Sequence, residues 1–79
     1  MTETLRNLAV GEAGRVAGFA PGRRSYRRRL LAMGLTPGVS FEVTRCAPMG
    51  DPVEIRLRGF SLSLRREEAE ALQIDRGQA

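Results

Sequence analysis

Two segments of strictly alternating apolar and polar residues constrain the fold of this chain more than any other feature. They span residues 39–44 (VSFEVT) and 53–57 (VEIRL). Because successive side chains of a β-strand point to opposite faces, each segment predicts a strand with one buried and one solvated face. We therefore expect Val39, Phe41 and Val43 to face inward.

Glycine and proline mark the turns around these strands. In Thr36-Pro37-Gly38-Val39, proline presets the first central residue and glycine tolerates positive φ at the second, which predicts a type II turn. Residues 47–52 (APMGDP) are predicted to form a loop. The segment 58–61 (RGFS) predicts a tight hairpin, with Gly59 at the first central position of a type II′ turn.

One segment has helical periodicity instead. Tyr26, Leu30 and Met33 recur at i, i+4 and i+7, which predicts an amphipathic helix over residues 25–33. Ser25 is the candidate N-cap, following a turn at Pro21-Gly22.

The helix should end at Gly34. Glycine lacks a Cβ and can take the left-handed conformation after the last helical turn. Leu35 would then fold back on Leu30 or Leu31, as in a Schellman motif. Gly34, Pro37 and Gly38 are therefore predicted to be structural turn residues.

Shorter signals complete the chain. Residues 14–19 predict a first strand, residues 66–71 a short helical turn and residues 72–74 a closing strand, followed by a frayed tail over 75–79. The side chains expected to cover or continue the core from these segments are Leu5, Leu8, Leu62 and Leu64.

These elements predict a single, mainly β domain over residues 1–79, with its core between about residues 5 and 74. Several short antiparallel strands with one inserted helix favour a small SH3-like, partly closed barrel of about five strands. Closure would protect strand edges that could otherwise pair between molecules.

Positive charge is concentrated in one place. The net charge is +4, and all thirteen basic residues are arginine. Five of them lie within seven residues: Arg23, Arg24, Arg27, Arg28 and Arg29. The other eight arginines are nearly balanced in number by the nine acidic residues of the chain. The excess charge is thus a single arginine patch on the predicted helix.

Three interpretations of this patch stay open: a solvated helix face, a docking surface for an acidic protein, and a phosphate-binding surface. Proteins that bind single-stranded nucleic acid usually have exposed aromatic side chains on which the bases stack. The four aromatic residues are Phe19, Tyr26, Phe41 and Phe60, and at least two of them fit the core. We therefore rank nucleic-acid binding last. Leu31 is expected near the arginines, about 100° around the helix from Leu30, where it could form the apolar centre of an interface.

The residues that catalysis or metal binding would use are scarce. The chain has no histidine and one cysteine, Cys46. Nucleophilic catalysis needs a base beside the nucleophile, and zinc or calcium sites need more ligands than Cys46, Asp51 and Glu54 supply. We expect no catalytic residue, no cofactor and no metal site.

The sequence contains no apolar run long enough for a membrane span and no signal-peptide pattern at its start. We expect a cytoplasmic protein without membrane insertion. The oligomeric state stays open.

Three motifs together resemble the FeoA family, the small cytosolic A components of bacterial ferrous iron uptake systems. They are the helix exit over residues 31–38 (LAMGLTPG), the loop over residues 47–52 (APMGDP) and the segment over residues 64–69 (LRREEA). The resemblance runs in one order from about Leu5 to Ile74 and implies an SH3-like fold.

The resemblance also implies a role beside FeoB, the membrane GTPase of the same system. We expect a non-enzymatic accessory protein that docks on the cytosolic part of FeoB through Arg27, Arg28 and Leu31, with Met49 as a weaker addition. In a sharper variant, one arginine enters the GTPase site and stabilises developing phosphate charge.

A rival resemblance is to the SH3-like C-terminal module of iron-dependent transcriptional repressors. Because the sequence begins at a methionine and shows no DNA-binding helix pair, the free-standing component is preferred. Two further alternatives are a nucleic-acid-binding barrel that uses the patch over residues 23–29 and a purely structural domain of an unknown assembly.

Overall fold

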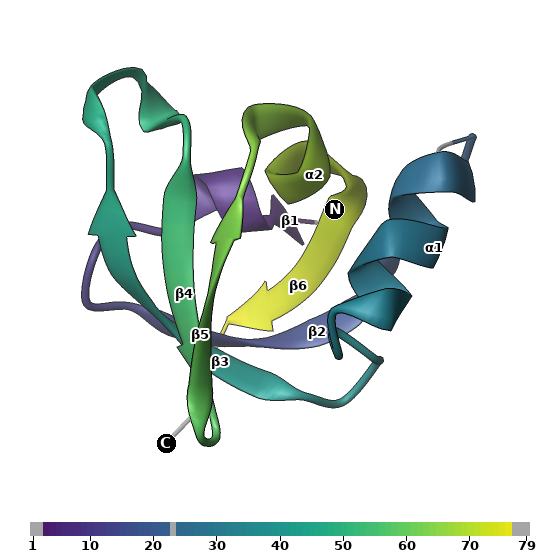
Figure 1. Cartoon of the computed structure of the whole chain (residues 1–79), viewed down its shortest axis with the longest axis horizontal. Coiled ribbons are helices and arrows are strands. Elements are labelled where there is room, and N and C mark those ends of the chain that lie inside the picture. The colour runs from purple at the N-terminus through teal and green to yellow at the C-terminus, as the bar shows by residue number, and fades with distance from the viewer. Residues whose placement is uncertain (1–2, 23, 77–79) are drawn as a thin grey trace.

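The computed structural model describes residues 3–22 and 24–76. Six antiparallel strands form one sheet in the order β1-β6-β2-β3-β4-β5 (Figure 1). The elements are β1 (Glu3–Thr4), β2 (Ala13–Phe19), α1 (Arg24–Ala32), β3 (Ser40–Cys46), β4 (Val53–Leu57), β5 (Phe60–Leu64), α2 (Arg66–Ala71) and β6 (Leu72–Arg76), with 3-10 turns at Leu5–Asn7 and Pro48–Gly50.

The sheet curls into a partly closed barrel whose two edges, β1 and β5, are not bonded to each other. This confirms the predicted mainly β class with an inserted helix. The strand count is six rather than about five, because Glu3 and Thr4 pair with Ile74 and Gln73 of β6. A two-residue strand leaves too short an alternation to be recognised from sequence.

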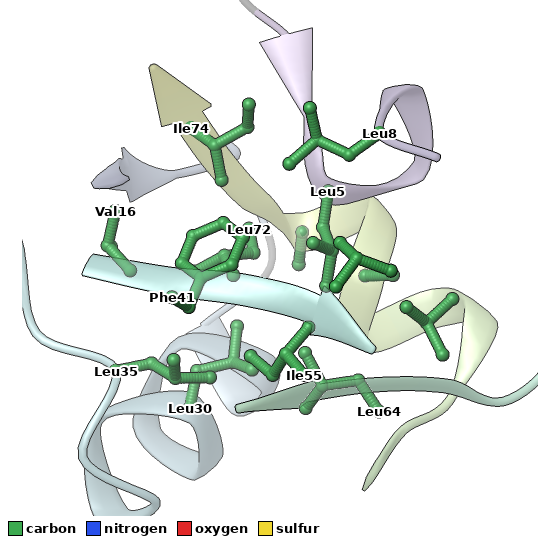
Figure 2. Close-up of a cluster of buried hydrophobic side chains, with 14 of the residues drawn as sticks. Leu5, Leu8, Val16, Leu30, Leu35, Phe41, Ile55, Leu64, Leu72 and Ile74 are labelled. Carbon is green, nitrogen blue, oxygen red and sulfur yellow. The ribbon is translucent and has the colours of Figure 1, made fainter. Parts of the chain in front are cut away.

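A single apolar cluster fills the barrel (Figure 2). Phe41 and Val43 are buried as the alternation predicts, while Val39 and Leu62 pack against the cluster from its margin. The buried hydrophobic residues are Leu5, Leu8, Val16, Leu30, Leu35, Phe41, Val43, Val53, Ile55, Leu57, Leu64, Ala69, Ala71, Leu72 and Ile74. Leu5 and Leu8 are part of this core, as the sequence predicts.

Helix α1 begins one residue earlier than predicted. Ser25 lies inside its first turn, so the predicted N-cap is wrong. A side chain caps a helix from the residue that precedes it, where the backbone is still extended. Ser25 lies after the first helical residue, Arg24, and therefore cannot take this role.

The C-terminal end of α1 confirms the predicted Schellman motif. The Gly34 N–H donates to the Leu31 carbonyl at 3.0 Å, and the Leu35 N–H donates to the Leu30 carbonyl at 3.0 Å. Gly34 has φ 96°, which only glycine adopts readily. Leu30 and Leu35 are both fully buried.

The next turn also forms as predicted. Gly38 has φ 95°, and the Val39 N–H donates to the Thr36 carbonyl at 3.1 Å. This geometry matches a type II turn, with positive φ at the second central residue.

The predicted type II′ hairpin is wrong in its register. Leu57 pairs with Phe60, so the two central residues are Arg58 and Gly59, and glycine stands second. Gly59 has φ 86°. Arg58 does not have a positive φ, because Met49 is the only non-glycine residue with positive φ among the described residues. The backbone therefore needs glycine one position later in the turn than predicted.

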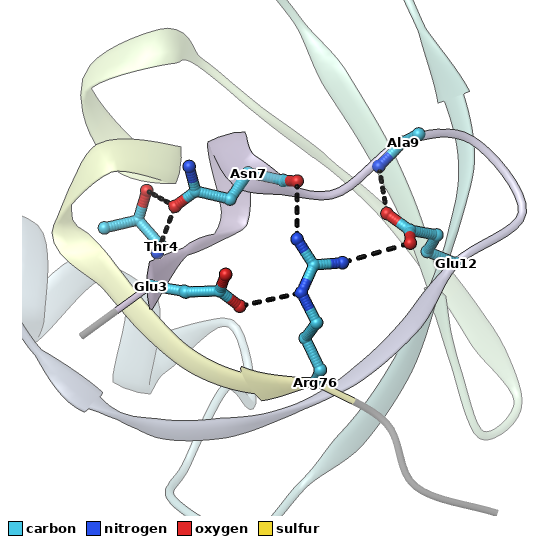
Figure 3. A network of polar contacts seen from close by, with 6 residues as sticks. All are labelled: Glu3, Thr4, Asn7, Ala9, Glu12 and Arg76. Atoms are coloured by element: carbon cyan, nitrogen blue, oxygen red, sulfur yellow. Dashed lines mark hydrogen bonds and ion pairs between the residues drawn. The ribbon is translucent and has the colours of Figure 1, made fainter. Parts of the chain in front are cut away.

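The predicted frayed tail is wrong for residues 75 and 76, and residues 77–79 lie outside the described residues. Asp75 and Arg76 extend β6 and pair with Arg15 and Gly14 of β2. The Arg76 guanidinium also contacts the Glu3 carboxylate at 2.9 Å, the Glu12 carboxylate at 3.0 Å and the Asn7 carbonyl at 3.3 Å (Figure 3). These contacts tie the two ends of the described chain together.

We predict that Gly34→Val destabilises the protein by about 1 to 3 kcal/mol, because valine would be forced to a positive φ. Thermal and urea unfolding would measure the loss. Thr36→Val is the matched control, since it places valine at an exposed neighbour with ordinary φ, and it should unfold close to wild type. Equal unfolding midpoints for Gly34→Val and wild type would contradict the assigned helix end.

A second prediction concerns acid sensitivity. The pKa of Glu12 lies below its ordinary value of 4.5, chiefly because the Ala9 N–H donates to its carboxylate and secondly because Arg76 is close. A lowered folded-state pKa stabilises the fold above about pH 4.5, and this contribution is lost as the pH falls through the folded-state pKa.

Glu12→Gln should therefore have a lower urea midpoint than wild type at pH 7, and the gap should narrow as the pH falls below 4.5. Glu54→Gln is the control, because Glu54 has no ion pair among the described residues. A gap for Glu12→Gln that is constant from pH 7 to pH 3 would contradict the prediction.

Candidate partner-binding surface on helix α1

The outer side of α1 carries a stripe of exposed arginines. Arg24, Arg27 and Arg28 are exposed, and none of them forms an ion pair with a described acidic residue. Residues three and four apart are neighbours on a helix surface, so these arginines form a continuous stripe that reaches Leu31. We call Arg24, Arg27, Arg28 and Leu31 the α1 stripe.

Charge elsewhere is largely balanced. Six of the nine acidic residues form ion pairs with arginines outside the stripe: Glu3, Glu12, Glu42, Asp51, Glu68 and Glu70. The stripe thus concentrates uncompensated positive charge on one side of the molecule, and such a field attracts anionic partners.

Arg29 has a different role from the other arginines of the predicted patch. Its guanidinium donates to the Glu68 carboxylate at 3.0 Å, and the Glu68 side chain is only 6% exposed. The other oxygen of Glu68 accepts the Arg65 N–H at 2.8 Å, at the start of α2. Glu68 therefore links α1 to α2, and no local sequence signal identifies a pair 39 residues apart.

Two cation–π contacts lie along the helix. The Arg27 guanidinium is 6.0 Å from the Phe19 ring centroid, and that of Arg29 is 5.8 Å from the Tyr26 ring. Because Phe19 belongs to β2, its ring holds Arg27 at one edge of the stripe while the charged group stays exposed. Arg23, the fifth arginine of the predicted patch, lies outside the described residues.

Leu31 is half-buried, whereas Leu30 and Leu35 are fully buried in the core. Leu31 is three residues from Arg28 and four from Arg27, which places all three on one helix surface. The structure brings these three predicted site residues together.

Met49 lies elsewhere. It is 86% exposed in the loop between β3 and β4. Figure 1 shows this loop on the opposite side of the molecule from α1. Met49 has φ 78°, and the loop is closed by the Gly50 N–H donating to the Ala47 carbonyl at 2.8 Å. The structure does not bring Met49 into the α1 stripe.

Phe60 is an exposed aromatic residue for which the sequence predicts no role in a binding site. It is 47% exposed at the start of β5, and its ring tip is 3.5 Å from the place where a Cβ on Gly34 would lie. Its exposure depends on the open edge of the sheet, which only the strand order reveals.

The described residues contain no group of three or more histidine, cysteine, aspartate or glutamate side chains placed to hold a metal ion. Cys46 is exposed at the end of β3, where it pairs with Val53. Neither α-helix in the part of the chain that the structure describes has the length and apolarity that crossing a bilayer requires.

The chain matches the family model of the FeoA domain over residues 3–76. The chain belongs to the FeoA family. The matched region includes the whole described fold and all residues of the α1 stripe.

Two FeoA-related proteins illustrate the similarity. The chain is 41% identical over 54 residues to a protein of Porphyromonas gingivalis described as an Fe(2+) transport protein A/Fe(2+) transporter FeoB fusion protein. The match covers 68% of this chain and 6% of that much longer protein. A FeoA-like protein from Clostridium acetobutylicum is 33% identical, with a TM-score of 0.87 over 99% of this chain and 90% of the other.

More distant structures share the fold alone. FeoA from Stenotrophomonas maltophilia, described as a procaryotic SH3 domain protein, is 22% identical, with a TM-score of 0.77 over 92% of this chain and 89% of the other. This similarity confirms the predicted SH3-like fold. A manganese-dependent transcriptional repressor is 15% identical, with a TM-score of 0.84 over 96% of this chain and 37% of the other.

We predict that Glu68→Gln and Arg29→Met each destabilise the fold by about 1 kcal/mol or more, because each breaks the contact between α1 and α2. The double variant should lose less than the sum of the two, with a coupling of about 0.5 kcal/mol or more in urea unfolding. Arg28→Met is the control and should change stability by less than about 0.5 kcal/mol. Additive losses would contradict the proposed link.

Proposed function

We propose that this protein is a non-enzymatic accessory component of ferrous iron uptake that docks on the cytosolic part of FeoB. The observation that carries the proposal is family membership combined with a relative in which a transport protein A and FeoB form one chain. Fusion of two proteins in one organism supports contact between their separate counterparts in another.

The α1 stripe is the surface we assign to this contact. Its arginines have no acidic partner among the described residues, so they are available to a partner's carboxylates. Half-buried Leu31 supplies apolar contact at the C-terminal end of the cationic stripe, and protein interfaces combine apolar with charged contacts.

Helix α1 is also held rigidly enough to serve as a docking element. Leu30 anchors the helix in the core and Arg29 anchors it to α2. Neither contact uses Arg24, Arg27 or Arg28, so these side chains stay accessible to a partner. A surface that is ordered before binding loses less conformational entropy when its partner docks.

Nucleic acid is a weaker candidate for the stripe. Phe41 is buried, Phe19 and Tyr26 are partly buried against the core, and exposed Phe60 lies beside Gly34 rather than among the arginines. Base stacking would need exposed rings among the arginines. The similarity to the manganese-dependent transcriptional repressor, at 15% identity, concerns the fold alone. It does not favour a role for this chain as a regulatory module of a repressor.

Binding to the purified soluble GTPase portion of FeoB from the same organism tests the proposal. Arg27→Glu combined with Leu31→Asp should lower affinity by about a hundredfold or more, because charge reversal and a new carboxylate at the interface centre oppose contact with an acidic surface. Titration calorimetry would measure the affinity of the wild-type protein and of the double variant for the GTPase portion. Circular dichroism would verify that the variant folds.

Arg45→Glu is the control for charge reversal, because it repeats the Arg27→Glu change at an exposed arginine of β3, away from α1. It should bind like wild type. Wild-type affinity of the double variant would reject the α1 stripe, and absence of binding by the wild-type protein would reject docking on this portion of FeoB.

A further inference from the structure

Strand β5 is a free edge of the sheet. A two-residue connection requires Leu57 and Phe60 to exchange hydrogen bonds, and bonded pairs then alternate along the ladder with β4. Ser61 and Ser63 therefore turn their N–H and C=O groups away from β4. Within the described residues, no backbone hydrogen bond connects these groups to another element.

The composition of β5 is unusual for an edge. Its sequence, FSLSL, contains no charge, whereas each of the other five described strands carries at least one charged residue. Natural proteins commonly protect sheet edges with charged side chains, proline or bulges. β5 has none of these, and its outer face presents only the small side chains of Ser61 and Ser63.

The other face of the edge is apolar. Phe60 is 47% exposed and Leu62 is only partly buried at the margin of the core. Side chains on the same face of a strand added beside β5 would pack against both and remove part of their apolar surface from water.

Arginines flank the uncharged strand at both ends. Arg58 lies in the turn before β5, and Arg65 and Arg66 follow it. Arg65 is 71% exposed, with Asp51 3.8 Å from its guanidinium. The edge therefore combines a neutral centre with cationic ends, which is complementary to a segment with acidic ends.

A second copy of this chain fits the edge poorly. If two β5 strands paired antiparallel through Ser61 and Ser63, Leu62 would lie on the symmetry axis. The turn that carries Arg58 would then come near the end of β5 of the second copy, where Arg65 and Arg66 follow the strand. Like charges brought together at both ends oppose such a pair.

We propose that the β5 edge binds an extended segment of another protein by β-strand addition, and that this segment is uncharged over about five residues and acidic at both ends. Ser61 and Ser63 supply the main-chain hydrogen bonds. Phe60 and Leu62 supply apolar contact, and the flanking arginines select the acidic ends. This surface is separate from the α1 stripe and does not depend on docking to FeoB.

The test uses the full chain and a synthetic probe. The probe is a blocked peptide with alternating valine and threonine in the centre and two glutamates at each end, and a second peptide has lysines in place of the glutamates. In titrations followed by NMR, the amides of Ser61 and Ser63 should shift most, and the glutamate peptide should bind at least about tenfold more tightly than the lysine peptide.

Two variants sharpen the test. Ser61→Pro removes one outward N–H at a position where an edge strand tolerates proline. It should lower the affinity for the glutamate peptide at least about tenfold. Arg58→Glu combined with Arg66→Glu should reverse the preference, so that the lysine peptide binds more tightly. This reversal also keeps the proposal testable if Ser61→Pro fails to fold.

Arg24→Glu combined with Arg28→Glu is the matched control, because it makes the same charge change on α1. It should leave peptide binding at the wild-type level. Equal affinity for the two peptides, amide shifts centred on α1, or weakening by the α1 variant would overturn the proposal. Dimerisation through β5 in light scattering at the titration concentration would also overturn it, because a second copy would then be the occupant.

Discussion

The packing of Leu30 against Leu35 is the contact on which the rest of this structure depends. Both residues are fully buried, and they meet because Gly34 reverses the chain at the end of α1 (Figure 2). This reversal fastens the C-terminal end of a short helix to the small barrel. Without it, the nine residues of α1 would be too few to remain helical by their own propensity.

Attachment on the inner side determines what the outer side can do. Leu30 is buried in the core and Arg29 is bound to Glu68, so Arg24, Arg27 and Arg28 project where no described carboxylate meets them. The same open architecture leaves β5 at one edge of the sheet, paired with β4 on one side only. The molecule thus offers two chemically different surfaces, a charged helix side and a neutral strand edge.

Much of the fold could be predicted because its signals are local. The alternation over residues 39–44 and 53–57, the glycine at the helix end and the Pro37-Gly38 turn each act through neighbouring residues. The errors have physical reasons of a different kind. Ser25, Gly59 and Asp75 were misplaced because hydrogen bonding decides the helix start, the hairpin register and the strand end.

The strand faces, the Gly34 and Pro37-Gly38 turns and the position of positive charge along the chain follow from side-chain period, backbone freedom and residue type, so residue order is enough to predict them. Three other features depend on tertiary packing: Arg29 pairs with Glu68, the loop that carries Met49 lies across the molecule from α1, and Arg76 binds Glu3 and Glu12. Each of these depends on groups far apart in sequence becoming neighbours when the sheet curls. Residue order does not encode such distances directly, since they arise from packing of the whole barrel.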